Sequence, residues 1–410
     1  MTYFVTLDDK KECVGIFSNG ELHFDEFPSD LTRTWKPTQS LKSISAETVE
    51  FAYLYAQGKT LTELCPDELK PKWEKINKRM SAYQNSFRES KVNLSENCLF
   101  DLIPLRYLTE FCYLKTEIIK HVFKTQEKPE NYEFMRNLCA LLVEIEGQKI
   151  KLNLTPLERN KHSKRERDFI KDMRQGHKAD FVTYDAFKTK TGRLSVKKGS
   201  FPILNLDREF RLIIEPTNDW ILELDYNAAE LRTLLALAGK EQPQEDIHIW
   251  NSDILHASRS EAKKSVISWL YGSKISDIGA KLSQMYAKEE VLSKFYDPVN
   301  QVVSTPFGRV IPADDHHALN YLVQSTTADL VFDRMIALQK FLKDKKSFIK
   351  FCLHDSVVID LSQEDMGDVA EIFNIFSNTK LDRFISSLSA GKNFGDLEKV
   401  ILADGSAQSA

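Results

Sequence analysis

Two aspartates are the first residues in this sequence that could do chemistry. Asp225 ends an alternating run that a helical pattern follows, and Asp355 stands between two β-rich runs at 348–353 and 356–361. Taken singly, each aspartate is typical of a helix cap or a turn. At one end of a shared sheet, the two carboxylates would supply the oxygen ligands that Mg²⁺ prefers. Two such ions about 3.5–4 Å apart stabilise in-line phosphoryl transfer, which is the chemistry that this pair indicates.

A stripe of four side chains could bind the substrate of that chemistry. Arg259, Lys263, Ile267 and Tyr271 follow one another at a constant spacing of four residues. On a helix this spacing places them in one stripe about 18 Å long. Two cations at one end and an aromatic ring at the other suit a nucleoside triphosphate. The alternative is a solvated basic edge of a helix.

Strands and a hairpin must position these residues. The run that ends at Asp225 predicts a strand, with a helix from about 228 to 239 after it. The runs around Asp355 predict a β-hairpin with this residue at its tip. Towards the N-terminus we expect three short strands, at 3–7, 14–17 and 21–24, and then helices from about 46 to 146.

Composition places the chain among ordinary globular proteins of two or three domains. Its 410 residues are 42% hydrophobic and 28% charged. No apolar run approaches the roughly 20 residues of a membrane span, and the N-terminus lacks the pattern of a signal peptide. We therefore expect no membrane partner and a cytoplasmic location. Six scattered cysteines without a C-x-x-C pair argue against a zinc ribbon and a disulfide framework.

Charge is unevenly distributed along the chain. The net charge is −4, but residues 160–200 hold 12 Lys and Arg against 5 Asp and Glu, whereas 201–410 hold 22 against 31. A basic segment beside an acidic body suits a protein that holds a phosphate backbone and also collects metal ions. Residues 158–175, which overlap this basic segment, predict a charged helix. Such helices are more often solvated faces than binding sites.

Together the three stretches resemble motifs A, B and C of the family A DNA polymerases, the DNA polymerase I group. The motif D-Y-S-x-I-E-L-R is matched by Asp225, Tyr226, Glu230, Leu231 and Arg232. The motif R-x3-K-x3-[FY]-x3-Y-G is matched by Arg259, Lys263, Tyr271 and Gly272, and v-H-D-E by Leu353, His354 and Asp355. Four further segments match the family's in the same order: 191–195, 246–248, 305–309 and 320–329.

The resemblance, which covers about residues 183–360, implies an α+β polymerase right hand with an antiparallel-sheet palm, helical fingers and a reduced thumb, preceded by a small β-then-helical N-terminal region. The expected divisions are an N-terminal region of unknown role (1–150), a basic thumb segment (151–190), palm with motif A (191–245), fingers (246–304), palm with motif C (305–402) and a flexible tail (403–410).

Roles follow by similarity to the family. Asp225, Asp355 and the carbonyl of Tyr226 would bind two Mg²⁺ ions, with Mn²⁺ as an alternative. Triphosphate contacts would come from Arg259, Lys263 and His248, and Lys263 is also the candidate general acid for the leaving pyrophosphate. Tyr271 would pack near the templating base, and Glu230 would lie against it and block a ribose 2′-hydroxyl. Contacts to DNA would come from Arg193, Asn320, Gln324 and His354.

Several positions depart from the family pattern. Ile267 stands where an aromatic ring usually faces the incoming sugar, Ser356 replaces the acidic neighbour of Asp355, and His316 replaces a common Arg. The segment 8–12 has the wrong spacing for the D-x-E start of a proofreading domain, so we expect no 3′–5′ exonuclease. A short thumb predicts a weak grip on DNA unless residues 1–150, or a processivity or replisome partner, supply a clamp.

The expected function is a template-directed DNA polymerase that adds dNTPs to the 3′-hydroxyl of a primer–template DNA. A single-subunit RNA polymerase is the enzymatic alternative, against which Glu230 argues. A non-catalytic, DNA-binding replisome scaffold on the same fold is the alternative from another class. The compact form is phage-like, which would place the protein in the cytoplasm of a host cell.

Overall fold

The computed structural model describes residues 1–7, 15–24, 27–39, 48–92, 97–159, 164–176, 178–273 and 276–402. It divides the chain into an N-terminal unit, Met1–Glu144, and a C-terminal unit, Ile145–Ala410, close to the expected boundary at 150. The segment 8–12 and the tail 403–410, on which two expectations rest, lie outside the described residues. Within the described residues, no helix combines the length and the apolar character needed to cross a bilayer.

A five-stranded sheet forms one layer of the N-terminal unit, in the order β3-β2-β1-β4-β5. The predicted strands are confirmed as β1 (Thr2–Thr6), β2 (Ile16–Ser18) and β3 (Glu21–His23), which pair antiparallel. Two further strands, β4 (Leu31–Thr34) and β5 (Glu50–Phe51), add in parallel on the other side of β1. The sequence analysis missed both, because such short runs show no periodicity.

The predicted helices of this unit are α1 (Ala52–Tyr55), α2 (Lys70–Glu89), α3 (Leu99–Leu102), α4 (Leu105–Thr125) and α5 (Tyr132–Glu146). Helix α4 packs on β1, and its buried Ile118, Ile119 and Val122 meet the core to which Phe4 and Val5 belong. Cys98 is disulfide-bonded, which the scattered cysteines did not predict.

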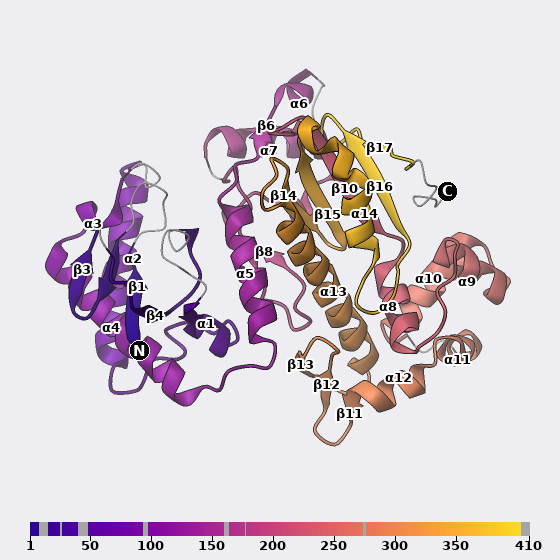
Figure 1. The fold of residues 1–410 in the computed structure, drawn as a ribbon, viewed down its shortest axis with the longest axis horizontal. Helices are drawn as coiled ribbons and strands as arrows, with labels where there is room; N and C mark the ends of the chain where they lie inside the picture. The colour runs from indigo at the N-terminus through magenta and orange to yellow at the C-terminus, as the bar shows by residue number, and fades with distance from the viewer. Residues whose placement is uncertain are drawn as a thin grey trace. The chain divides into compact units, whose positions relative to one another are not determined.

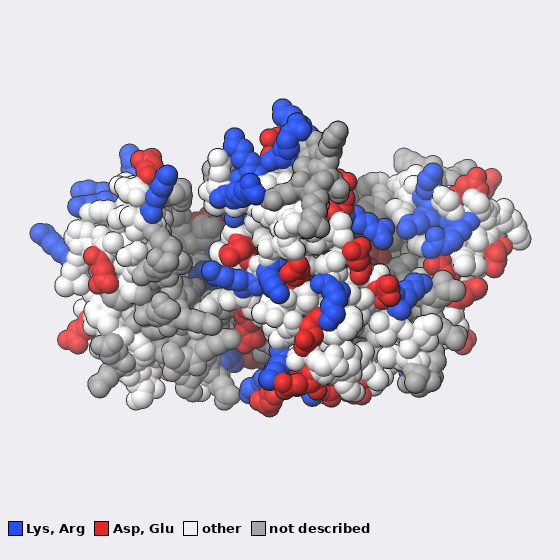
Figure 2. Space-filling model, turned by 90° about the horizontal axis from the view of Figure 1, so that it is seen from above, with Lys and Arg blue, Asp and Glu red and all other residues white. Residues whose placement is uncertain are grey.

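The C-terminal unit begins with short helices and strands that precede its central sheet. They are β6 (Lys151–Leu152), α6 (Thr155–Arg159), α7 (Lys164–Arg174), β7 (Tyr184–Asp185), β8 (Ser195–Val196), two 3₁₀-helices, η3 (Ile203–Asn205) and η4 (Arg208–Ile213), and β9 (Ile214–Glu215). β6 pairs with β9, and β7 pairs with β8. These two pairings connect residues 151–185 to residues 195–215 of the same unit. Figure 2 shows Lys and Arg side chains gathered over α6 and α7, in the middle of the view.

A central antiparallel sheet, in the order β14-β15-β10-β16-β17, holds the two aspartate stretches (Figure 1). Its strands are β10 (Trp220–Tyr226), β14 (Phe348–Leu353), β15 (Ser356–Leu361), β16 (Ser386–Gly391) and β17 (Glu398–Lys399). Helices α13 (Ala318–Leu342) and α14 (Val369–Ser377) pack on one face. Tyr226 points to that face, where its ring stacks on Phe376 with centroids 4.1 Å apart.

Helices between these strands share one further core. They are α8 (Ala229–Leu237), α9 (Ile247–Leu255), α10 (Arg259–Leu270), α11 (Ser276–Met285) and α12 (Lys288–Phe295), followed by a small sheet of β11 (Tyr296–Asp297), β12 (Val302–Ser304) and β13 (Val310–Pro312). Leu231, Val266, Trp269 and Tyr286 bring α8, α10 and the segment around α11 into this core. A capping box between Ser258 and Glu261 begins α10.

A buried ion pair secures the far end of the central sheet from the two aspartates. Lys350 Nζ lies 2.6 Å from Asp360 Oδ2, and both side chains are almost fully buried. Asp360 also accepts hydrogen bonds from the backbone N–H groups of Thr217 and Asn218, at 2.7 and 2.8 Å. These contacts hold the loop that leads into β10.

Removing the cation should therefore destabilise the sheet. We expect Lys350→Met to lower the free energy of unfolding by about 3–5 kcal/mol, because it leaves the Asp360 carboxylate buried without its charge partner. Urea unfolding followed by circular dichroism measures the change. As a control, Lys346→Met breaks an exposed pair with Glu364 and should cost at most about 1 kcal/mol. Equal losses in the two variants would contradict this role of the buried pair.

Candidate active site

The antiparallel register of β10 and β15 brings the two aspartates together. Asp225 is paired directly with Ser356, and Asp355 is the neighbouring residue in the hairpin turn. Leu353 pairs with Ser356 across that turn, so it consists only of His354 and Asp355, with His354 at a positive φ of 57°. The predicted hairpin, with Asp355 at its tip, is confirmed.

Partial burial raises the pKa of both carboxylates, and the charge of Asp355 adds to the effect on Asp225. Burial, the charge of Asp355 and that of Glu223 raise the pKa of Asp225 to about 7. Burial also raises the pKa of Asp355. Two carboxylates with so little compensation suit a divalent cation, which neutralises both. In the described ranges no group of three or more His, Cys, Asp or Glu side chains could enclose a metal ion, so an ion here would need further ligands from backbone, solvent or substrate.

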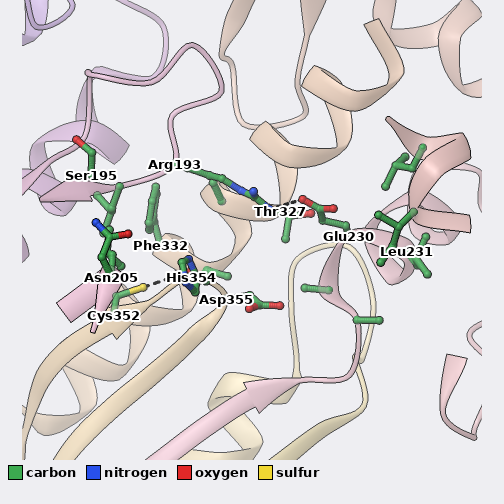
Figure 3. A pocket seen from close by; sticks show the side chains of 18 of the residues that line it. Arg193, Ser195, Asn205, Glu230, Leu231, Thr327, Phe332, Cys352, His354 and Asp355 are labelled. Atoms are coloured by element: carbon green, nitrogen blue, oxygen red, sulfur yellow. Dashed lines mark hydrogen bonds and ion pairs between the residues drawn. The ribbon is translucent and has the colours of Figure 1, made fainter. Parts of the chain in front are cut away.

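A cavity of about 540 Å³ lies beside the aspartate hairpin (Figure 3). It brings together part of the predicted site: Arg193, Glu230, His248, Lys263, Ile267, His354 and Asp355. The hairpin forms one wall and helices α9 and α10 supply His248 and Lys263. The other predicted residues do not line it: Asp225, Tyr226, Arg259, Tyr271, Asn320 and Gln324.

A fully buried arginine connects the end of β10 to α9. The Arg232 guanidinium donates to the backbone and side-chain oxygens of Asn227, at 2.9 and 3.1 Å, and to the carbonyl oxygens of Pro243 and Glu245. Asn227 in turn donates to Asp246 at 3.0 Å. Burial lowers the pKa of Arg232 to about 10, which still leaves it charged near neutral pH. This arginine of motif A is thus a structural residue in the fold.

Asp246 carries this connection to the helix stripe. Its side chain caps α9 by accepting from the backbone N–H groups of His248 and Ile249. It also pairs with Arg259, whose Nη2 lies 2.8 Å away. Burial alone would raise the pKa of Asp246, but the hydrogen bonds from Arg259 and Asn227 outweigh it and hold the pKa well below its usual range. Arg259 is therefore held at the start of α10.

His248 presents an unused polar atom at the cavity. Its Nδ1 is buried and has no hydrogen-bond partner within the described residues. Burial, followed by the charges of Lys263 and Arg259, lowers the pKa of this imidazole, although Asp246 opposes the effect. A neutral imidazole beside the Lys263 ammonium can accept or donate one further hydrogen bond.

Glu230 and Tyr271 have other partners than each other. Arg193 reaches over the cavity and forms an ion pair with Glu230, as Figure 3 shows. Burial raises the pKa of Glu230, against the lowering effect of Arg193. The Tyr271 hydroxyl accepts a hydrogen bond from Gln324 Nε2 at 2.9 Å, and Gln324 Oε1 lies 3.3 Å from the Thr191 hydroxyl. The expected neighbours are thus engaged separately.

Two glycines of the motifs are required by close packing. A Cβ on Gly192 would lie 2.5 Å from Arg309 Cζ, and one on Gly272 would lie 2.5 Å from His316 Cε1. Both glycines also have positive φ angles, of 75° and 87°. His316, one of the departures from the family pattern, is thus packed against the glycine that ends the stripe.

Further polar residues near the site belong to none of the motifs. Tyr184 donates to the carbonyl oxygen of Cys352 and accepts from its backbone N–H, which ties the segment before β8 to β14. Glu223 lies beside Ser356. Glu223 could have been found from sequence as the residue two positions before Asp225 on the same strand face; Tyr184 carries no such signal. By contrast, Asn320 belongs to the matched segment 320–329, and its Nδ2 is buried and lacks a hydrogen-bond partner among the described residues.

Comparisons with known proteins bear on the fold that carries this site. No family model matches the chain. A solved structure, the "POL domain of Pol1 from M. smegmatis complex with DNA primer-template and dNTP", superposes with a TM-score of 0.65 and 13% identity, over 96% of this chain and 95% of that one. The chain therefore shares the fold of that polymerase domain. The predicted mixed α and β polymerase fold is confirmed at this level.

Sequence similarity to this polymerase group is partial. A DNA polymerase of Mycobacterium phage L5 is 25% identical in an alignment of 177 residues that covers 37% of this chain. The same match spans 29% of the phage protein's length, so the chain matches less than a third of that relative.

The repulsion between Asp225 and Asp355 can be tested through protein stability, without a measurement of catalysis. The raised pKa of Asp225 means that its contribution to stability is present at acidic pH and is lost as pH rises towards about 7. With chelator present at pH 8, we expect Asp225→Asn to raise the melting temperature by roughly 2–4 °C, and by less at pH 5. Mg²⁺ should stabilise the wild type but not this variant.

Differential scanning calorimetry at both pH values measures these shifts. Asp253→Asn, a substitution on the exposed side of α9, serves as the matched control and should leave the melting temperature and its Mg²⁺ response unchanged. A variant that melts below the wild type at pH 8, or that keeps the full response to Mg²⁺, would contradict the assignment.

Proposed function

We propose that this chain is a template-directed DNA polymerase that adds dNTPs to the 3′-hydroxyl of a primer–template DNA. The observation that carries the proposal is the register of β10 and β15, which sets Asp225 beside Asp355, a residue that lines the same cavity as Lys263. The fold shared with a polymerase domain, and the partial similarity to a phage DNA polymerase, support it. The further proposal that no proofreading exonuclease is present rests on the sequence.

Asp225, Asp355 and the Tyr226 carbonyl would hold two Mg²⁺ ions, or Mn²⁺ in their place. The Tyr226 side chain is turned to the opposite face and buried, which leaves its carbonyl as the group it can offer. When bound, such ions lower the pKa of the attacking hydroxyl and stabilise charge on the transferred phosphoryl group. The carboxylates orient the primer end, and His354, in the same turn, is placed to support it.

The first two residues of the stripe, Arg259 and Lys263, would bind the triphosphate. Lys263 and His248 line the cavity, and Asp246 holds the Arg259 guanidinium at the head of α10. An ammonium in this position can donate a proton to the leaving pyrophosphate. The unpartnered Nδ1 of His248 is available for a phosphate oxygen. Ile267, 40% exposed at the cavity, lies where the sugar would pass.

DNA contacts would come from the residues around the cavity. Arg193 is paired with Glu230, and Gln324 donates a hydrogen bond to Tyr271. Each residue would have to leave its present partner to contact the minor groove of the DNA. The buried amide of Asn320 offers an unused donor. We propose that the central sheet is the palm, the helices from α9 to α12 the fingers, and the basic segment with α6 and α7 a reduced thumb that a processivity partner would supplement.

Primer extension on a singly primed template tests this function. We expect Asp225→Asn and Asp355→Asn each to lower the rate by roughly 10³-fold or more, because several kcal/mol of transition-state stabilisation is lost. Asp253→Asn should extend like the wild type. Binding of the primer–template with no incorporation by the wild type, with Mg²⁺ or Mn²⁺, would indicate the replisome scaffold instead.

Sugar selection separates a DNA from an RNA polymerase. If Glu230 excludes a 2′-hydroxyl by its volume, Glu230→Ala should incorporate NTPs at least about tenfold better than the wild type, relative to dNTPs. Glu230→Gln keeps the volume but breaks the ion pair with Arg193, and it should still reject NTPs. Incorporation ratios from single-nucleotide extension measure the effect. NTP use by the wild type equal to its dNTP use would favour the RNA polymerase.

A further inference from the structure

Glu223 is a third carboxylate on the strand face that carries Asp225. Residues 223 and 225 alternate with Leu222, Leu224 and Tyr226, which are buried on the helix-covered face. Glu223 therefore projects to the face of the sheet on which the proposed cation site lies. A role for it there rests on the proposed function and deepens it.

A hydroxyl from the neighbouring strand holds this carboxylate. Ser356 Oγ lies 3.3 Å from Glu223 Oε1 and 3.0 Å from the carbonyl oxygen of Leu353. Ser356 is the direct ladder partner of Asp225 and the chain neighbour of Asp355. One serine thus contacts the third carboxylate while it stands between the two proposed metal ligands.

Electrostatics connect the three acids. Burial raises the pKa of Glu223, while Ser356 and then Arg211 and Arg208 act to lower it. The Glu223 charge is in turn one of the causes that raise the pKa of Asp225. The carboxylate is therefore close enough to Asp355 and to two arginines of η4 for their charges to act on it. Its negative charge adds to the potential that a cation would meet at the pair.

Glu223 lies beside Ser356, a position at which the sequence departs from the polymerase motif. Ser356 stands where the polymerase motif has a carboxylate next to Asp355. Because side chains opposite each other in an antiparallel pair share a face, a carboxylate on β15 at 356 and one on β10 at 223 would serve the same patch. The chain has a serine at the first position and a glutamate at the second.

We propose that Glu223, held by Ser356, is a positioning residue that raises the affinity of the Asp225–Asp355 pair for divalent cations. It acts through its charge and its hydrogen bond and not as a third ligand, since in the described part of the chain no three such side chains are grouped closely enough to enclose an ion. A purely structural role, in which Glu223 only pairs with the arginines of η4, predicts a loss of stability without a specific loss of cation binding.

Direct Mn²⁺ binding to the full chain, followed by electron paramagnetic resonance, distinguishes these roles without activity. Glu223→Gln keeps the shape and removes the charge, and we expect it to weaken Mn²⁺ binding by about tenfold or more, as loss of an outer partner of a metal site does. Glu223→Asp, which keeps the charge, should retain more affinity. Glu209→Gln, on the exposed side of η4, should bind like the wild type.

Restoring the lost carboxylate from the facing strand tests the proposal more directly. The double variant Glu223→Gln with Ser356→Glu restores a carboxylate from the facing strand, and it should regain most of the lost affinity. Wild-type affinity in Glu223→Gln with normal folding, by circular dichroism, would overturn the inference and leave the proposed function standing. If Asp225→Asn bound Mn²⁺ as well as the wild type does, the cation site itself, and with it the proposed function, would fail.

Discussion

Repulsion between the half-buried carboxylates of Asp225 and Asp355 is the interaction around which the site of the C-terminal unit is arranged. The ladder of β10 and β15 sets one acid opposite Ser356 and the other next to it, and burial removes the water that would weaken their effect on each other. A fold keeps such an arrangement only if the rest of the structure enforces it. Here the buried Lys350–Asp360 pair and the stacking of Tyr226 on Phe376 hold the sheet in register from the other end and the other face.

The helices on the far side of the cavity depend on the same strand end. Arg232 joins Asn227, just after β10, to the loop that carries Asp246, and Asp246 both caps α9 and holds Arg259. The Arg259 guanidinium, which would meet a triphosphate, is therefore placed by a chain of hydrogen bonds that starts just after the aspartate strand. Any movement of α9 and α10 relative to the sheet would have to keep or exchange the contacts of Asp246 with Asn227 and Arg259.

Much of the fold around the site could be predicted, because it depends on local patterns. Alternation identified β10, the β-rich runs around Asp355 identified the hairpin, and the spacing of four identified α10. Polar contacts between distant segments could not be predicted in this way. The pairing of Arg193 with Glu230, and that of Tyr271 with Gln324, depend on how loops and helices far apart in the chain approach one another. The short strands β4 and β5 were missed for a similar reason, since they exist only by pairing with β1.

The sequence by itself determined which residue types are present for chemistry and on which local elements they lie, since periodicity and turn signals act over a few residues. It also showed that the acid next to Asp355 is missing. Only the tertiary structure decided which residue stands in its neighbourhood, because Glu223 and Ser356 are far apart in the chain and meet through strand pairing. The same holds for the shifted pKa of Asp225, which arises from burial and from charges that the fold, and not the sequence order, brings close.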